Sequence, residues 1–341
     1  MEIIPIDKIM MKFSTPLPGD TESLKKIIKE LKGDIYEVYM AGPSEFMGSG
    51  RATLHSPLIE DIGRQVSYAH KHNIKFKLIL NPSCLSGQQL TSNGYNIFRN
   101  YFEELETLNV DAVIVSDPYL VEMLSKDLQN LQIGVSCIAH VDSSQRAKFF
   151  EDLGADEITI DTNINRHFDL LESIRDSTDC ELKVIANEAC LYKCPFRYSH
   201  FNLFSHITAS PQIAIIGDYY FEKCISLRVR EPTLIIRSPW IRPEDVPEYE
   251  KIGIDIIKIS GRANTTQWII DTMKSYTSGH HKGNLLELLD CPNELRDHFH
   301  IPNEKLEGAI EQWKTCKKLC HKCNFCETLA KELILKRRDI G

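Results

Sequence analysis

The feature that most constrains the fold of this chain is a motif that recurs along it. The segments LETLNVDAVIVSDP (105–118), FEDLGADEITIDT (150–162) and YEKIGIDIIKISG (249–261) each combine a helix end, a tight turn, an aspartate and a short β-branched strand. Continuously apolar runs of this kind are typical of strands buried on both faces of a parallel sheet. Further strands are predicted at 11–17, 34–42, 75–82, 132–140 and 181–189, with amphipathic helical stretches between them.

Eight strand–helix units predict a TIM-type (β/α)8 barrel, in complete, modified or incomplete form. The alternative is a doubly wound open sheet, but no GxGxxG fingerprint follows the first strand. We expect the barrel to span 1–275, with a cysteine-bearing insertion at 190–250. So long a connection after the seventh strand is expected to lie over the active-site face. A small helical, cysteine-rich tail is predicted at 276–341.

The composition of the 341 residues is that of an ordinary globular protein. Forty basic and 48 acidic residues give a net charge of −8, which disfavours non-specific binding to nucleic acid but allows a local basic groove. The sequence has no apolar run long enough for a membrane span, and its start, MEIIPIDKIMMKF, does not resemble a signal peptide. These features predict a cytoplasmic protein without a membrane partner.

Eleven cysteines are distributed unevenly, which in a reducing compartment indicates metal or redox chemistry rather than disulfides. Cys190 and Cys194 follow the seventh expected strand, and Cys224 comes about thirty residues later in the same insertion. Three thiolates in one loop suit three irons of a [4Fe–4S] cluster, and Cys194 precedes a proline, as ligands at the end of iron–sulfur runs do. The alternative is a buried apolar Cys190 and a free Cys194 thiol.

A second group, Cys316, Cys320, Cys323 and Cys326, occupies eleven residues of the tail. Thiolates this dense repel one another unless a cation neutralises them, so we expect at least three of them to bind metal and to fix the tail to the barrel. Their CxxxCxxC spacing is that of radical enzymes using S-adenosylmethionine, but those enzymes carry it after the first barrel strand. A second iron–sulfur cluster and a zinc ion both fit, and one of these cysteines is alternatively the fourth ligand of the Cys190 cluster.

Polar residues near strand ends complete the candidate site, because the carboxyl ends of barrel strands carry the active site. Glu188 ends the seventh strand, and Arg197 and His200 follow the cysteine pair. These three are candidate catalytic residues, with His200 as general acid or base. For each, the alternative is a hydrogen bond or ion pair that only fixes the loop. The candidates for binding an anionic substrate are Arg51, Lys258 and Arg262.

The segments EACLYKCPFRYSHFN, SPWIRPEDVPEYEKIGIDIIKISGR and GSGRAT resemble peptidase family U-32, the collagenase-like proteases, over roughly 10–275. The tail cysteines recur in a single-domain branch of that family, and Ser260 stands where its members commonly carry Glu. The resemblance implies a barrel-like fold and a [4Fe–4S] cluster, and Cys190, Cys194 and Cys224 match three of its four usual ligands. In better-understood branches it implies oxygen-independent hydroxylation of RNA bases or ubiquinone precursors, with prephenate as oxygen donor in some.

Three classes of function follow. The first is an iron–sulfur hydroxylase or related oxidoreductase that works under anaerobic conditions. The second is a peptidase, although neither GxSxG nor HExxH is present to support the usual protease machinery. The third is an iron–sulfur assembly or binding subunit that acts with a second subunit of the family. The sequence does not distinguish a small molecule, an RNA and a peptide as the substrate.

Overall fold

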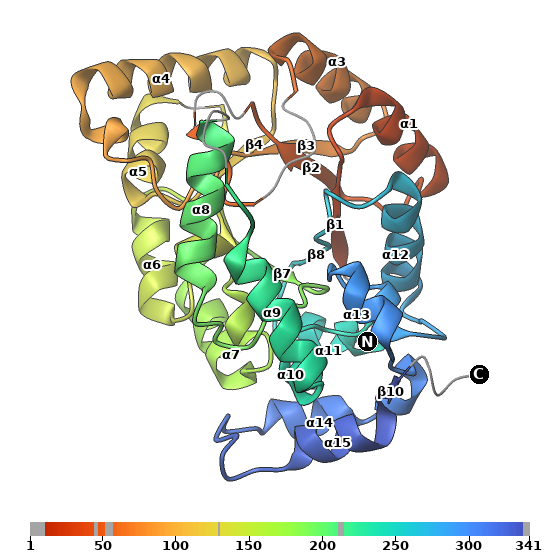
Figure 1. Cartoon of the computed structure of the whole chain (residues 1–341). Helices are drawn as coiled ribbons and strands as arrows, with labels where there is room; N and C mark the ends of the chain where they lie inside the picture. Colours follow the sequence, from red (N-terminus) through yellow and green to blue (C-terminus); the bar gives the residue numbers. More distant parts are fainter. Residues whose placement is uncertain (1–10, 44–46, 52–56, 129, 211–214, 337–341) are drawn as a thin grey trace, which may run out of the picture.

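The computed structural model describes residues 11–43, 47–51, 57–128, 130–210 and 215–336. Eight parallel strands pair in sequence order and close into a barrel, with helices around it (Figure 1). The predicted (β/α)8 barrel is therefore confirmed, in its closed form. The strands are β1 (Lys12–Pro16), β2 (Glu37–Ala41), β3 (Lys75–Ile79), β4 (Ala112–Val115), β5 (Gln132–Val135), β6 (Glu157–Thr159), β7 (Glu181–Ile185) and β8 (Ile256–Lys258).

The barrel helices form because polar caps precede amphipathic stretches. The Asp20 side chain accepts the backbone N–H of Ser23, and α1 then buries Leu24, Ile27 and Ile28 against the barrel. Thr91, Asp117, Ser143 and Thr265 cap four more helices in the same way. The barrel helices are α1 (Thr21–Glu30), α3 (Ile59–His70), α4 (Ser92–Thr107), α5 (Pro118–Asp127), α6 (Ser144–Asp152), α7 (Phe168–Ser177) and α12 (Thr266–Ser278).

The aspartates of the repeated motif have a shared structural role. Asp111, Asp156 and Asp255 each lie just before a strand, and each carboxylate accepts a backbone N–H from the neighbouring strand. The donors are Phe76 on β3, Ile133 on β5 and Leu182 on β7, at 2.6, 2.7 and 2.8 Å. These bonds satisfy backbone groups where the strands begin, which explains why the motif recurs.

Two buried lysines and two buried glutamates form a ring of ion pairs inside the barrel, which the sequence analysis did not predict. Lys77 pairs with Glu37 at 2.7 Å and also with Glu157, while Lys183 pairs with the same two carboxylates at 2.6 and 2.8 Å. Burial alone would raise the pKa of Glu37, but the charges of Lys183 and Lys77 outweigh it and hold that pKa far below its usual value.

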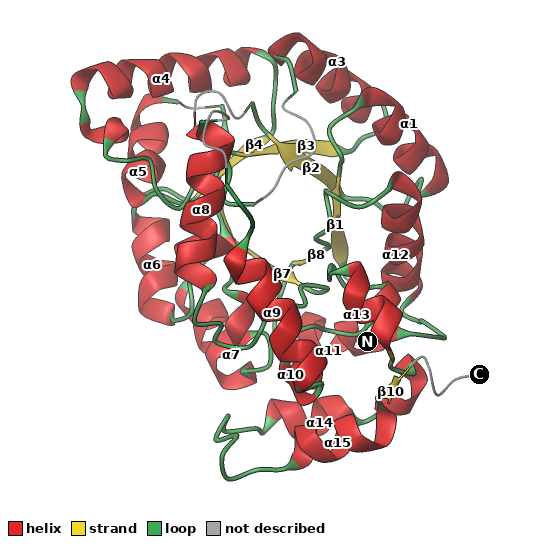
Figure 2. Cartoon of the chain, in the orientation of Figure 1, coloured by secondary structure: helices red, strands yellow, loops and turns green. Residues whose placement is uncertain are grey.

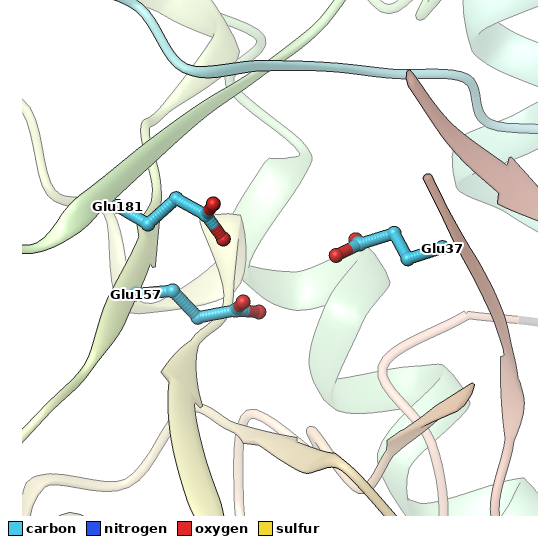
Figure 3. A group of neighbouring side chains, drawn as sticks. All are labelled: Glu37, Glu157 and Glu181. Carbon is cyan, nitrogen blue, oxygen red and sulfur yellow. The ribbon is translucent and has the colours of Figure 1, made fainter. Parts of the chain in front are cut away.

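Carboxylate oxygens of Glu37, Glu157 and Glu181 lie within 4.8 Å of one another and point toward a common centre (Figure 3). Such a trio resembles a cation site. However, the lysine ring already neutralises two of these carboxylates, and Lys12 pairs with Glu181 at 2.9 Å. We therefore assign the trio a structural role.

The insertion after β7 is helical and leads to β8 (Figure 2). It comprises α8 (Arg197–Ala209), α9 (Tyr219–Arg230), α10 (Thr233–Arg237) and α11 (Val246–Lys251). Short 3-10 turns are η1 (Gln88–Leu90), η2 (Cys137–Ala139), η3 (Thr162–Ile164), η4 (Pro243–Asp245), η5 (Leu285–Glu287) and η6 (Asn303–Leu306). Within the described residues, no helix has the length and apolar character that crossing a membrane requires.

The tail after α12 packs into the barrel's own core. It contains α13 (Asn293–His298), α14 (Ala309–Lys314), α15 (Phe325–Leu333) and an antiparallel pair, β9 (Phe299–His300) with β10 (Leu335–Lys336). Trp313 is buried and meets Trp240 of the insertion edge-on, with ring centroids 5.3 Å apart. In Figure 1, α15 runs beside α10 at the edge of the barrel. Apolar contacts therefore anchor the tail to the barrel without any metal ion.

Candidate active site

A cavity of about 560 Å³ opens at the carboxyl ends of the barrel strands. We call it the mouth cavity. Its wall comes from the ends of β2, β3 and β5 to β8, from α8 and α9 of the insertion, and from the segment that leads into α13. In a TIM-type barrel this face carries the catalytic groups, so the mouth cavity is the candidate active site.

Five cysteines line the mouth cavity, and one of them is Cys137 on η2. Cys190 and Cys194 lie in the loop after β7, Cys224 lies on α9, and Cys291 lies just before α13. Cys190, Cys194 and Cys224 were predicted to act together, and the structure places them together. Cys291 was missed, although it precedes Pro292 as Cys194 precedes Pro195, and this Cys-Pro pair was a signal in the sequence.

Arg228 connects the segments that carry these cysteines. Its guanidinium is buried and donates hydrogen bonds to the backbone carbonyls of Ala189, at 2.8 Å, and Cys224, at 3.4 Å. Among the described residues no carboxylate pairs with Arg228. Burial raises the pKa of the Cys194 and Cys291 thiols, and the charge of Arg228 opposes that rise at both. The site thus combines several thiols with a buried cation for which the described part of the chain offers no carboxylate partner.

Glu188 accepts from two arginines. The Arg51 guanidinium lies 2.7 Å and that of Arg197 lies 3.3 Å from the same carboxylate oxygen, and Arg197 also donates to the Thr162 hydroxyl. Burial favours the neutral acid, but the two guanidinium charges outweigh it and hold the pKa of Glu188 far below its usual value. Arg51 Nη1 lies 4.0 Å from the Cys190 sulfur. Glu188 therefore positions two cations beside Cys190.

Replacing Glu188 by Gln should lower the free energy of unfolding by about 2–3 kcal/mol, because it leaves two arginines without their shared carboxylate. The folded pKa lies below the unfolded value of about 4.3, so the contribution is present above that pH and is lost as pH falls. Urea denaturation at pH 7 and at pH 3 measures this: the difference between wild type and variant should be full at pH 7 and smaller at pH 3, because the contribution is lost progressively as pH falls from the unfolded pKa toward the lower folded pKa. Glu30→Gln, at an exposed pair with Lys274, is the control. An equal loss at both pH values would contradict the assignment.

His200 belongs to an aromatic wall of the mouth cavity. Its Nε2 lies 2.8 Å from the Asp218 carboxylate, which leaves Nδ1 free to accept a proton. Burial lowers the pKa of His200 despite the opposing effect of Asp218, so the imidazole is neutral near pH 7. The surrounding aromatic side chains in the cavity wall are Phe196, Phe204, Tyr220 and Phe221.

Lys258 and Arg262 form a cationic wall at the end of β8. Lys258 Nζ lies 4.1 Å from the centre of the Tyr39 ring, and neither side chain pairs with a carboxylate of the described residues. The Arg262 Nη1 atom is buried without a hydrogen-bond partner within that part of the chain. Burial, together with the charge of Lys183, lowers the pKa of Lys258 to about 8. These cations are placed to bind an anionic group.

The sequence-predicted polar residues therefore meet at the mouth in two groups. His200, Lys258 and Arg262 line the mouth cavity, whereas Glu188 and Arg197 form a buried ion pair behind it and Arg51 joins both. The contacts of Glu188 and Arg197 are those of an ion pair that fixes the loop, which was the alternative to direct contact with a substrate.

The tail cysteines lie elsewhere. Cys316, Cys320 and Cys326 line a separate pocket, which we call the tail pocket, and Cys323 is exposed on the same loop. Arg166, Lys318 and Trp313 also line it. Of the described cysteines, Cys291 and Cys137, and none of the tail group, line the mouth cavity with Cys190, Cys194 and Cys224.

Comparison with known proteins identifies the family. The model of peptidase family U32 matches residues 19–209, more than half of the chain. The uncharacterized protease MJ1657 of Methanocaldococcus jannaschii is 47% identical over 332 residues, which cover 94% of this chain and 98% of that protein. The chain belongs to peptidase family U32. The resemblance inferred from the cysteine loop and the strand-eight segment is thereby confirmed.

Two further similarities bear on this U32 chain. The solved structure of the U32 peptidase Mk0906 superposes with a TM-score of 0.58 at 24% identity, covering 76% of this chain and 97% of that one, which shows a shared fold. The 23S rRNA 5-hydroxycytidine C2501 synthase of Escherichia coli K12 is 26% identical over 152 residues, or 45% of this U32 chain and 21% of that protein.

Proposed function

We propose that this protein is an iron–sulfur enzyme that hydroxylates a flat, conjugated ring at the mouth cavity, without molecular oxygen. The observation that carries the proposal is the meeting of Cys190, Cys194, Cys224 and Cys291 in one cavity at the carboxyl end of the barrel. These cysteines come from three separate parts of the chain, so their proximity is not a consequence of being close in sequence. Four thiolates are the usual ligand set of a [4Fe–4S] cluster.

The cysteine sulfurs of the described chain are not gathered as a tetrahedral zinc site would gather them, and the charges around them suit an anionic cluster. Sulfur ligands of tetrahedral zinc lie about 3.8 Å apart, given Zn–S bonds of about 2.3 Å. No three cysteine sulfurs of the described chain lie within 4.8 Å of one another. Arg228 and Arg51 supply positive charge beside the thiols, as a group with net negative charge requires. When bound, the cluster would supply one-electron chemistry at the cavity.

The two walls of the mouth cavity match a substrate with a flat ring and an anionic part. Phe196, Phe204 and Tyr220 offer faces on which a ring can stack, as aromatic side chains do for unpaired bases. Lys258 and Arg262 would bind a phosphate or carboxylate. The similarity to an rRNA hydroxycytidine synthase supports an RNA base as the ring. Prephenate, the donor implied by the family, carries carboxylates that suit the same cations.

The residues of the chain would orient the ring and handle protons. His200, held by Asp218 through Nε2, presents a neutral imidazole whose Nδ1 can accept the proton that leaves the ring carbon. Glu188 keeps Arg51 and Arg197 in place and does not itself exchange protons near neutral pH.

The proposal is tested by anaerobic reconstitution with iron and sulfide, followed by incubation with unmodified rRNA and prephenate. Mass spectrometry of the nucleosides should show the gain of one oxygen atom, and a Cys194→Ser variant should not produce it. Cleavage of denatured collagen that persists in the Cys194→Ser variant would instead support a peptidase. Activity only after addition of a co-purified subunit would support the assembly-subunit alternative.

Binding of an anionic substrate should depend on pH through Lys258. Its pKa of about 8 means that the side chain is charged below this pH and neutral above it. We expect the affinity for prephenate to fall about tenfold as pH rises from 7 to 9, because one charge-assisted contact is lost. Calorimetric titration of wild type and Lys258→Arg measures this, since arginine stays charged throughout. The same decline in the arginine variant would show that another group titrates.

A further inference from the structure

We propose that the tail pocket is a second iron–sulfur site, with Cys316, Cys320, Cys323 and Cys326 as the ligands of a [4Fe–4S] cluster. Three of these cysteines line the tail pocket, and Cys323 lies on the loop between α14 and α15 that closes it. The inference concerns a site apart from the mouth cavity and does not rest on the function proposed for that cavity.

The strongest independent observation is Arg166. It is buried, and among the described residues its guanidinium donates only to backbone carbonyls, those of Ile236 at 2.8 Å and Trp240 at 3.0 Å. It lies against both the Trp240 and Trp313 rings, 4.3 and 3.7 Å from their centres. In the described part of the chain no carboxylate forms an ion pair with it. A buried charge of this kind calls for an anionic neighbour.

The groups that face Arg166 across the pocket are the tail cysteines. Arg166 lines the tail pocket together with Cys316, Cys320 and Cys326. Thiolates bound to an iron–sulfur core would place negative charge beside Arg166, whose acidic neighbour Asp245 is already paired with Arg242. Arg228 is a similar cation beside the mouth cysteines: within the described residues its guanidinium also donates only to backbone carbonyls.

Lys318 adds a second cation at the tail pocket. Its Nζ donates to the carbonyls of Arg166, at 2.6 Å, and Trp313, at 3.1 Å, and of the described residues none pairs with it through a carboxylate. Lys318 lines the same pocket as Cys316, Cys320 and Cys326. Two cations with carbonyl partners therefore converge on the same three thiols.

Spacing favours a cluster over zinc. Cys320, Cys323 and Cys326 repeat the C-x2-C-x2-C spacing of the ligand run of bacterial ferredoxins, in which one chain segment holds three irons of a cubane. Cys316 precedes this run and lines the same pocket as two of its members. As at the mouth, three tail sulfurs within 4.8 Å, which tetrahedral zinc would need, do not occur in the described structure.

Metal counting on point variants tests the site. A truncation is unsuitable because Trp313 and Cys291 belong to the core and to the mouth cavity. After anaerobic reconstitution with excess iron and sulfide, wild type should hold about eight iron atoms per chain, and Cys320→Ser/Cys326→Ser about four. The mouth variant Cys194→Ser should also hold about four, and Cys84→Ser, outside both sites, about eight.

The outcomes separate the two sites. Wild-type iron content in the Cys320→Ser/Cys326→Ser variant, or zinc and no iron at the tail, overturns the second site. Unchanged iron in Cys194→Ser overturns the mouth cluster and leaves the tail proposal standing.

A second pair of variants keeps all ligands and so does not depend on whether the cysteine variant folds. Lys318→Met removes a cation next to the tail thiols, whereas Lys322→Met removes an exposed one on the same loop. We expect the midpoint potential of the tail signal, followed by electron paramagnetic resonance during a redox titration, to become more negative in Lys318→Met and to change less in Lys322→Met. A potential that neither substitution alters would show that no cluster lies beside Lys318.

Discussion

Replacement of Cys291 by serine is expected to remove about half of the iron and to abolish hydroxylation. The Cys291 thiol lies in the mouth cavity with those of Cys190, Cys194 and Cys224. Among the described residues, Cys137 is the one other cysteine that lines this cavity. Substitutions of groups that only support metal ligands cost about 10- to 100-fold in activity, so loss of a ligand should cost at least about 100-fold.

The control for Cys291 is Cys137→Ser. Cys137 is buried in the same cavity wall, where burial raises the pKa of its thiol, and it lies on η2, a different element from those that carry the four proposed ligands. Iron and sulfide analysis with single-turnover assays compares the two variants. Full iron content in Cys291→Ser together with loss of iron in Cys137→Ser would reassign the fourth ligand to Cys137.

Replacement of Lys77 by methionine should destabilise the protein by about 4 kcal/mol. The side chain is 1% exposed and pairs with both Glu37 and Glu157, so its loss leaves two buried carboxylates to share Lys183. Breaking a buried ion pair by removing one partner costs about 3–5 kcal/mol. Equilibrium unfolding in urea measures this, provided that the transition stays two-state.

The matched control for Lys77 is Lys12→Met, the same substitution on β1, another strand of the barrel. Lys12 pairs with Glu181, but its side chain is 42% exposed, so the expected loss is at most about 1 kcal/mol. Similar losses in the two variants would show that the buried ring contributes no more than a surface pair.

The barrel could be predicted because its information is local. The turn–Asp–strand motif is visible in a dozen residues, and Asp111, Asp156 and Asp255 make their bonds to the adjacent strand. The ring of buried lysines and glutamates could not be predicted from the hydrophobic pattern, because one charged residue inside an apolar strand does not change the periodicity of that strand. Lys77 in KFKLI and Lys183 in ELKVI were nonetheless signals, since a charge is rarely placed in a strand buried on both faces without a partner.

The candidate site was predictable in part for the same reason. Cys190, Cys194, Glu188 and Arg197 follow one strand, so their proximity can be inferred from the sequence. Cys291 follows the last barrel helix, and only the folding of the tail back into the core brings it to the mouth cavity. No local pattern specifies that return.

The loop from Cys190 to Cys194 has two faces. Its cysteines line the mouth cavity, whereas Tyr192 lines the tail pocket, as does Asn163, whose side-chain oxygen accepts the Lys193 N–H at 2.7 Å. A ligand that orders the loop from one side lowers the entropy cost of ordering it from the other, and thermodynamic linkage makes this effect reciprocal. Binding of the mouth cluster and of the tail cluster is therefore expected to be cooperative. When iron is limiting, most chains should hold both clusters or neither.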